Sequence, residues 1–227
     1  MDLQFADAIN RILISAIPLL LGIICHEVAH GYVAYRCGDP TAKVMGRLTL
    51  NPIVHIDPMG IAAFVLTALL FPFALGWAKP VPVDTRNLRN PRRDMALVAA
   101  AGPVTNFILA VLFMSCFIAV ILLFQQEYSG STVYAFFYNM LQAGVLINLV
   151  LAFFNLLPIP PMDGSRLLSM ALPYEAARAY NELERYGMII VLIFVASGLF
   201  RIVIFPLVEW CYAKMFLLFL QTLNLFM

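Results

Sequence analysis

Three residues near the start of the chain have the types and spacing needed for metal-assisted hydrolysis. His26, Glu27 and His30 form the pattern H-E-x-x-H within the stretch IICHEVAHGY. Residues four apart lie on the same face of a helix, so both imidazoles can bind one metal ion. Neutral imidazoles suit zinc, which lowers the pKa of a bound water to about 7, and the adjacent carboxylate can take that water's proton. The spacing therefore predicts a zinc site on a helix.

These polar residues lie inside a run that is otherwise apolar enough for a lipid bilayer. Ionisable side chains cost roughly 2.5 kcal/mol or more each at the centre of a membrane helix. The plainer interpretation is a set of hydrogen-bonded core residues, because three fixed letters make a pattern of only middling specificity. Their position within an apolar helix favours metal binding instead.

A catalytic zinc site takes three protein ligands and leaves one position for water, so a further ligand must come from elsewhere. His55, the third histidine, lies in the polar stretch NPIVHIDPMG, whereas Asp163 follows three prolines in NLLPIPPMDG. Those prolines end the preceding helix, and extended backbone at membrane depth must line protein or a watery cavity. Asp163 can therefore reach inward, although it can also be an ordinary turn residue. Asn148 and Asn155 are seven residues apart and share the helix face that leads to this turn.

The composition is that of a membrane protein. Hydrophobic residues make up 63% of the chain and charged residues 12%, against about 45 to 50% and 25% in soluble domains. The net charge of +1 excludes a strongly basic surface, so we expect no nucleic-acid partner. The four cysteines show no C-x-x-C spacing, and we expect no disulfide framework.

The apolar segments predict an all-α polytopic membrane protein with about five to six transmembrane or re-entrant helices. These segments are residues 9–35, 61–75, 95–124, 133–157 and 187–226. Arg201, Pro206 and Glu209 are expected to divide the last segment in two. The stretches MGRLTLNP and GWAKPVPV predict a small membrane-associated β-hairpin element. We expect one domain over residues 1–227, with a core at about 9–166 and C-terminal helices at about 187–226.

Segment 61–75 is shorter than a usual span and is bracketed by Pro58, Gly60, Pro72 and Gly76, so we expect it to be re-entrant. Nearly all basic residues between the apolar segments then fall on one side of the membrane, with Arg11 on the other. The positive-inside rule makes the basic side cytoplasmic. We therefore expect a multi-pass protein of the cell (plasma or inner) membrane with its basic loops and active site toward the cytoplasm.

The motifs together resemble those of the site-2 proteases, which are zinc-dependent intramembrane metalloproteases of peptidase family M50. H-E-x-x-H is followed by AGPVTN at the start of another helix and by NLLPIPPMDG at the end of a third, in fixed order. The compact bacterial and archaeal branch without PDZ or CBS domains also contains stretches similar to NPIVHIDPMG and GWAKPVPV. The resemblance covers about residues 20–166 and implies that Asp163 is the third zinc ligand and Glu27 the catalytic acid/base. It assigns no role to His55 and covers no motif in the last forty residues.

The resemblance implies cleavage of transmembrane protein or peptide substrates near the cytoplasmic side, with one zinc ion per chain. Asn106 and Asn148 are candidates for stabilising the oxyanion, and Asn155 and His55 for contacting the substrate. The alternatives are a membrane zinc transporter and an inactive relative that binds membrane helices. Transport needs further ligands on facing helices, and the chain has only three histidines. Besides substrate and the lipid bilayer, the sequence leaves open assembly into a homo-oligomer.

Overall fold

Helices form the regular structure of the protein, which is described by a computed structural model over residues 2–70, 76–128 and 130–224. The long helices are α1 (Asp2–Arg36), α4 (Pro91–Tyr128), α5 (Thr132–Asn155) and α9 (Leu199–Asn224). The shorter helices are α2 (Thr41–Val44), α3 (Pro58–Leu70), α6 (Asp163–Ala171), α7 (Tyr174–Asn181) and α8 (Gly187–Ala196). Three 3₁₀ turns complete the order: η1 (Pro52–His55), η2 (Thr85–Asn87) and η3 (Glu182–Tyr186).

Four of these helices are long and apolar enough to cross a membrane: residues 9–36 of α1, 91–124 of α4, 132–155 of α5 and 199–222 of α9. A helix suits the bilayer because it satisfies its backbone hydrogen bonds internally. The 13 residues of α3 extend about 20 Å at 1.5 Å each, less than the hydrocarbon thickness of about 30 Å. The prediction of an all-α membrane protein is confirmed.

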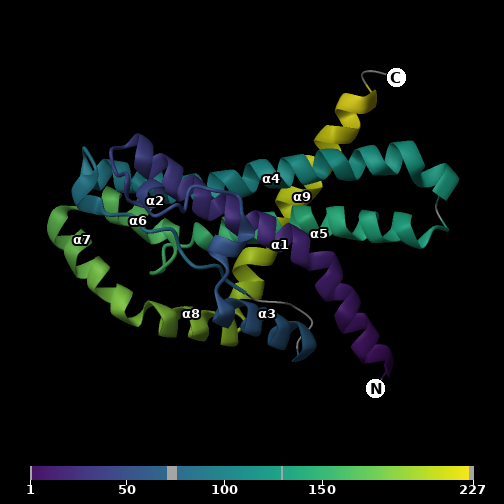
Figure 1. The fold of residues 1–227 in the computed structure, drawn as a ribbon, viewed down its shortest axis with the longest axis horizontal. Coiled ribbons are helices and arrows are strands. Elements are labelled where there is room, and N and C mark those ends of the chain that lie inside the picture. Colours follow the sequence, from purple (N-terminus) through teal and green to yellow (C-terminus); the bar gives the residue numbers. More distant parts are fainter. Residues whose placement is uncertain (1, 71–75, 129, 225–227) are drawn as a thin grey trace.

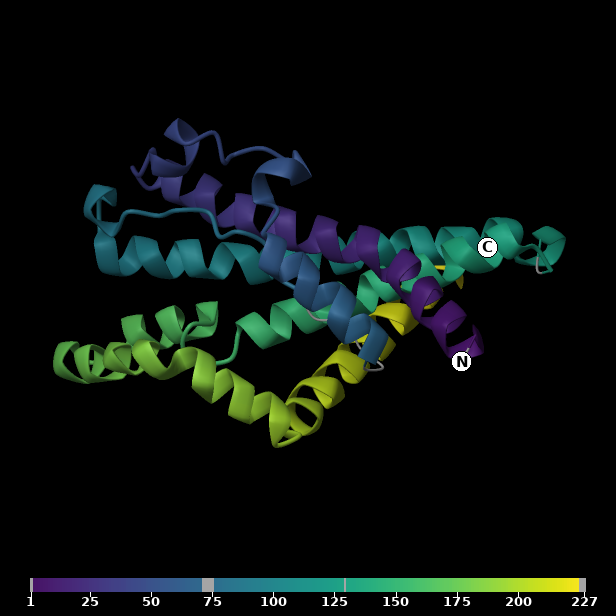
Figure 2. The ribbon, with the colours of Figure 1, turned by 60° about the horizontal axis from the view of Figure 1, so that its bottom comes forward.

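The core of the molecule lies where α1, α4 and α5 run side by side, with α9 crossing α5 (Figures 1 and 2). Apolar side chains spaced three and four residues apart on α4 meet side chains from α5 and α9. The buried cluster comprises Ala110, Met114, Phe117, Ile118, Val145, Leu149, Ile204 and Val208. Gly144 on α5 lies directly against the ring of Phe113 on α4, where a Cβ atom would be 2.4 Å from a ring carbon. The helices therefore approach closely at this point.

The chain enters and leaves the α3 region at the same place, as a re-entrant segment requires. A Cβ atom on Gly60, at the start of α3, would lie 2.0 Å from the carbonyl oxygen of Trp77. Gly76 is packed against Phe64 and the carbonyl oxygen of Gly60 in the same way. The part of predicted segment 61–75 beyond residue 70 lies outside the described residues.

The predicted β-hairpin element is wrong for the described part of the chain, which contains no strand. Residues 45–52 form turns after α2, and residues 77–83 run extended without a ladder. The physical reason is that Pro80 and Pro82 have no backbone N–H, which removes two of the donors that a ladder needs. One backbone hydrogen bond joins the two regions, from Lys79 N–H to the His55 carbonyl at 2.8 Å.

The C-terminal segment is divided as predicted, but at a different residue. The break between α8 and α9 falls at Ser197 and Gly198, where Gly198 adopts φ +80°. A glycine with positive φ ends a helix at little steric cost, and the N–H of Gly198 bonds to the Val195 carbonyl at 3.1 Å. Pro206 lies inside α9 instead of ending it, as membrane helices tolerate.

Candidate metal centre

His26, His30 and Asp163 meet at one point although they lie on two elements. The two histidines are one turn apart on α1, and Asp163 is the first residue of α6. Oδ2 of Asp163 is 3.1 Å from Nε2 of His26 and 3.3 Å from Nε2 of His30, and the two Nε2 atoms are 2.9 Å apart. Among the described residues, these three form the group that could hold a metal ion.

The other ring nitrogen of each histidine faces a hydrogen-bond acceptor. Nδ1 of His26 is 2.6 Å from Oδ1 of Asn106, and Nδ1 of His30 is 2.7 Å from the carbonyl oxygen of Val98. A carbonyl oxygen only accepts, so each Nδ1 carries the proton and each neutral ring presents its Nε2 lone pair. Two lone pairs and a carboxylate oxygen therefore point at one another, which is stable only with a cation or extra protons between them.

The spacing of the three atoms fits a small metal ion. Zinc bonds of about 2.0 to 2.1 Å in a tetrahedron place neighbouring ligand atoms about 3.3 Å apart, close to the separations of 2.9 to 3.3 Å found here. Oδ2 of Asp163 is buried and has no hydrogen-bond donor other than these ring nitrogens. Burial by itself raises the pKa of Asp163, but its interactions with His26 and His30 lower it to about 2. The carboxylate is therefore ionised at neutral pH and available to a cation.

A chain of two buried amides fixes the orientation of His26. Nδ2 of Asn148 donates to the Gly144 carbonyl at 2.9 Å, so Oδ1 of Asn148 faces Nδ2 of Asn106 at 3.0 Å. Nδ2 of Asn106 also donates to the Gly22 carbonyl at 3.1 Å, which leaves Oδ1 of Asn106 for His26. Both asparagines are fully buried. Such partners of a metal-binding histidine hold its ring and its tautomer.

Gly102 on α4 brings the backbone of that helix against both imidazoles. A Cβ atom at this position would lie 2.5 Å from Cε1 of His26 and 2.6 Å from Cε1 of His30. The next residue, Pro103, has no N–H to bond back along α4, so the helix ladder is interrupted beside the site. Sequence reasoning missed Gly102, although it lies in the AGPVTN motif, because a glycine gives no sign of what it contacts.

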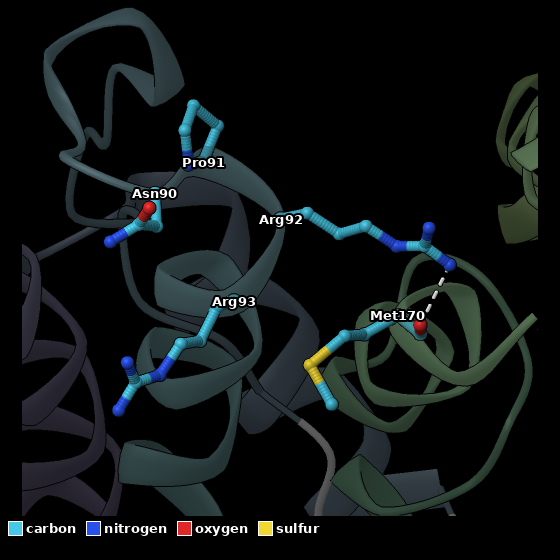
Figure 3. A pocket seen from close by; sticks show the side chains of 5 residues that line it. All are labelled: Asn90, Pro91, Arg92, Arg93 and Met170. Atoms are coloured by element: carbon cyan, nitrogen blue, oxygen red, sulfur yellow. Dashed lines mark hydrogen bonds between the residues drawn. The ribbon is translucent and has the colours of Figure 1, made fainter.

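The helix that begins with Asp163 is held at both ends. At its start, Gly164 packs on the end of α5, where a Cβ atom would be 2.1 Å from the Leu156 carbonyl oxygen. At its other end, Arg92 of α4 donates to the Met170 carbonyl at 2.7 Å and to the Leu172 carbonyl (Figure 3). These contacts fix where the Asp163 carboxylate lies. An open pocket of about 540 Å³ separates the two helix ends, lined by Asn90, Pro91, Arg92, Arg93 and Met170.

Glu27 lies beside the metal ligands and faces the extended segment 77–83. The backbone N–H of Val81 donates to Oε2 of Glu27 at 2.7 Å. Val81 is buried, and Gly31, one turn further along α1, allows this approach because its missing Cβ would lie 2.7 Å from Cγ1 of Val81. One carboxylate oxygen of Glu27 is therefore fixed by a backbone donor from a distant part of the chain.

The structure does not bring the remaining candidates, His55 and Asn155, into the group of metal-binding atoms. His55 is buried, with Nε2 bonded to the Thr49 carbonyl at 2.8 Å. It lines a small cavity of about 30 Å³ together with Ile23 and Ile24 of α1 and Trp77. Asn155 ends α5, and its side chain donates to the Leu151 carbonyl at 3.0 Å. Both lie within the core region without contacting His26 or His30.

Comparison with known proteins places this arrangement in a family. The sequence profile of Peptidase family M50 matches residues 14–126 and 119–199. The chain belongs to peptidase family M50. This M50 peptidase is 40% identical over 196 residues to "Putative zinc metalloprotease YwhC" of Bacillus subtilis, covering 85% of this chain and 84% of that protein.

More distant relatives carry names of the same kind. "Putative zinc metalloprotease Rip2" of Mycobacterium tuberculosis is 30% identical over 194 residues, covering 85% of this chain and 70% of that protein. The protein of that name in Mycolicibacterium smegmatis is 28% identical over 194 residues, covering 84% of this chain and 70% of that protein. No solved structure matches this chain. The M50 peptidase described here is therefore a zinc metalloendopeptidase with apolar helices typical of a membrane protein.

Proposed function

We propose that this chain is an intramembrane endopeptidase that hydrolyses peptide bonds of transmembrane substrates near the cytoplasmic side, in regulated intramembrane proteolysis. The observation that carries this proposal is the convergence of His26, His30 and Asp163 on a helix long and apolar enough to span a bilayer. His30 precedes Arg36, the last residue of α1, by six residues, which is about 9 Å along a helix. The site is thus within reach of water from that end.

In this proposal one zinc ion per chain is held by Nε2 of His26, Nε2 of His30 and Oδ2 of Asp163. Zinc bound there supplies a Lewis acid and lowers the pKa of water toward neutrality. Glu27 takes the proton from the attacking water and returns it to the nitrogen of the leaving amine. Its hydrogen bond with Val81 occupies Oε2, so Oε1 is the oxygen that we assign to these proton transfers.

The buried asparagines receive a positioning role. The amides of Asn106 and Asn148 are bonded to His26, Gly22 and Gly144. These contacts support holding the imidazole of His26 in place and give no support to the predicted contact with an oxyanion. For Asn155 and His55, a contact with substrate remains a prediction.

The substrate must present an unwound segment, because a helix hides its peptide bonds in its own hydrogen bonds. The extended residues 77–83 pass Glu27 and offer a place for such a segment to lie. The basic residues of α2, α6, α7 and the start of α4 gather at the end of the molecule where α1 ends (Figure 1). That gathering supports a cytoplasmic position for this end, by the positive-inside rule.

The test is cleavage of a transmembrane substrate by the purified protein in liposomes, with Glu27→Gln as the decisive variant. The substitution keeps the size of the side chain and removes its basicity, so we expect zinc content to be unchanged and cleavage to fall below detection. Asp163→Ala is expected to lose both zinc and cleavage. A Glu27→Gln protein that cuts at the wild-type rate would remove Glu27 from the reaction.

A further inference from the structure

Arg47 is a buried cation that the zinc site does not use directly. It follows α2 in the loop toward η1, and 8% of its surface is exposed. None of the ion pairs found among the described residues includes it. A buried charge of this kind is costly unless hydrogen bonds satisfy it. Its place in the structure therefore needs an explanation.

The guanidinium of Arg47 holds backbone carbonyls from two separate segments. Nη1 donates to the Val54 carbonyl in η1, and Nη2 donates to the Lys79 carbonyl at 2.7 Å and the Pro80 carbonyl at 3.3 Å. Charge-assisted hydrogen bonds from a planar guanidinium are strong and directional. Arg47 thus takes the place of the strand ladder that Pro80 and Pro82 prevent.

The segment that Arg47 holds is the one that holds Glu27. Within Pro80–Val81–Pro82, Val81 has the single backbone N–H, and this N–H donates to Oε2 of Glu27. Leu48, the residue after Arg47, packs on Gly31 of α1 beside Val81. The Pro80 carbonyl and the Val81 nitrogen belong to one planar peptide unit. Fixing that carbonyl therefore fixes the direction of the Val81 N–H.

We propose that Arg47 is a positioning residue for the acid/base Glu27, acting through the peptide unit between Pro80 and Val81. It fixes Oε2 of Glu27 and thereby aims Oε1 at the position of the attacking water. This inference depends on the proposed role of Glu27. A misplacement of about 1 Å in a reacting group can cost about 10²-fold in rate.

The first experiment compares Arg47→Gln with Arg36→Gln, a matched change of an exposed arginine at the end of α1. Both proteins are assayed in liposomes with one transmembrane substrate. For Arg47→Gln we expect wild-type zinc content, kcat lower by about 10²-fold and KM within about threefold of wild type. Arg36→Gln is expected to behave as wild type. An Arg47→Gln protein with wild-type kcat, or with a change in KM alone, would overturn the proposal.

The second experiment tests the same pathway without changing Arg47, in case Arg47→Gln does not fold. Val81→Pro removes the N–H that binds Glu27, whereas Val81→Ala keeps it, and we expect kcat of the proline variant to be about 10²-fold below that of the alanine variant. In the double variant Arg47→Gln/Val81→Pro, the two losses should not multiply, because both act on one hydrogen bond. Equal kcat for the two Val81 variants, or losses that multiply, would contradict the proposal.

The two proposals fail in different ways. If Glu27→Gln cleaves normally, the proposed function is wrong. If Glu27→Gln is inactive while Arg47→Gln and Val81→Pro retain wild-type kcat, only the positioning role of Arg47 is wrong.

Discussion

At the scale of single residues, the tautomers of His26 and His30 decide what the site can hold. Backbone and amide oxygens take the proton on each Nδ1 and leave both Nε2 lone pairs facing Asp163. An ionised carboxylate completes the set. These groups repel one another without a cation, so metal binding follows from the hydrogen bonds around the ligands as much as from the ligands themselves.

The amide of Asn106 should therefore matter for metal affinity although it is not a ligand. Asn106→Leu removes the acceptor for Nδ1 of His26 and frees the ring to turn. We expect zinc affinity to fall by roughly 10- to 100-fold, measured by competition with a zinc chelator. Ser115→Ala, which changes an exposed polar residue of the same helix, should leave the affinity unchanged. Equal affinities for the two variants would exclude a positioning role for Asn106.

At the scale of elements, the site depends on how closely α1 and α4 approach. Gly102→Ala adds a methyl group that would overlap both imidazoles, and α4 must move to accommodate it. We expect the variant to stay folded but to lose most of its zinc and activity. Gly130→Ala is the matched control, because nothing lies within 4 Å of that position. Full zinc content in Gly102→Ala would show that the helices are not in close contact at the histidines.

The link between the end of α1 and η2 depends on a buried carboxylate outside the membrane. Asp39 accepts hydrogen bonds from Thr41, from the side chain of Asn87 at 2.9 Å and from the N–H of Asp84 at 2.7 Å. Burial raises the pKa of Asp39, but these hydrogen bonds outweigh it and hold the pKa below its usual value. All of its partners donate, so only an acceptor satisfies them.

Asp39→Asn should destabilise the protein, because its amide N–H₂ would face donors. A loss of about 2 kcal/mol corresponds to a melting temperature lower by roughly 5 °C, measured in detergent at pH 7. The contribution of ionised Asp39 is fully present above pH about 3.9 and is lost as the pH falls through the lower pKa of the folded state. The difference between wild type and variant should therefore shrink on acidification. A difference that stays constant down to pH 2 would contradict this assignment.

At the scale of the whole molecule, the long apolar runs and the motifs were sufficient to predict helices and the three metal-binding residues. Asp163 was predictable because prolines announce a break at membrane depth. The contacts of Val81, Gly102 and Arg47 were not, because they involve backbone atoms or the absence of a side chain and join residues far apart in the chain. The absence of a strand in residues 77–83 likewise depends on Arg47 occupying the carbonyls.

The orientation of the molecule in the membrane can be tested by thiol labelling. Thr85→Cys lies in η2 at the basic end, and Gly130→Cys lies in the loop between α4 and α5 at the other end (Figure 1). In a background without the four native cysteines, we expect an impermeant thiol reagent to label Gly130→Cys in intact cells and Thr85→Cys only after the cytoplasmic face is exposed. The reverse pattern would place the site near the opposite face.

The central claim is that His26, His30 and Asp163 bind the zinc ion. Zinc-edge X-ray absorption of the purified protein loaded with one equivalent of zinc tests it most directly. We predict nitrogen and oxygen neighbours at about 2.0 to 2.1 Å, with the signature of two imidazoles, and the loss of one oxygen neighbour or of the metal in Asp163→Ala. A sulfur neighbour at about 2.3 Å, or a wild-type spectrum from Asp163→Ala, would contradict the account.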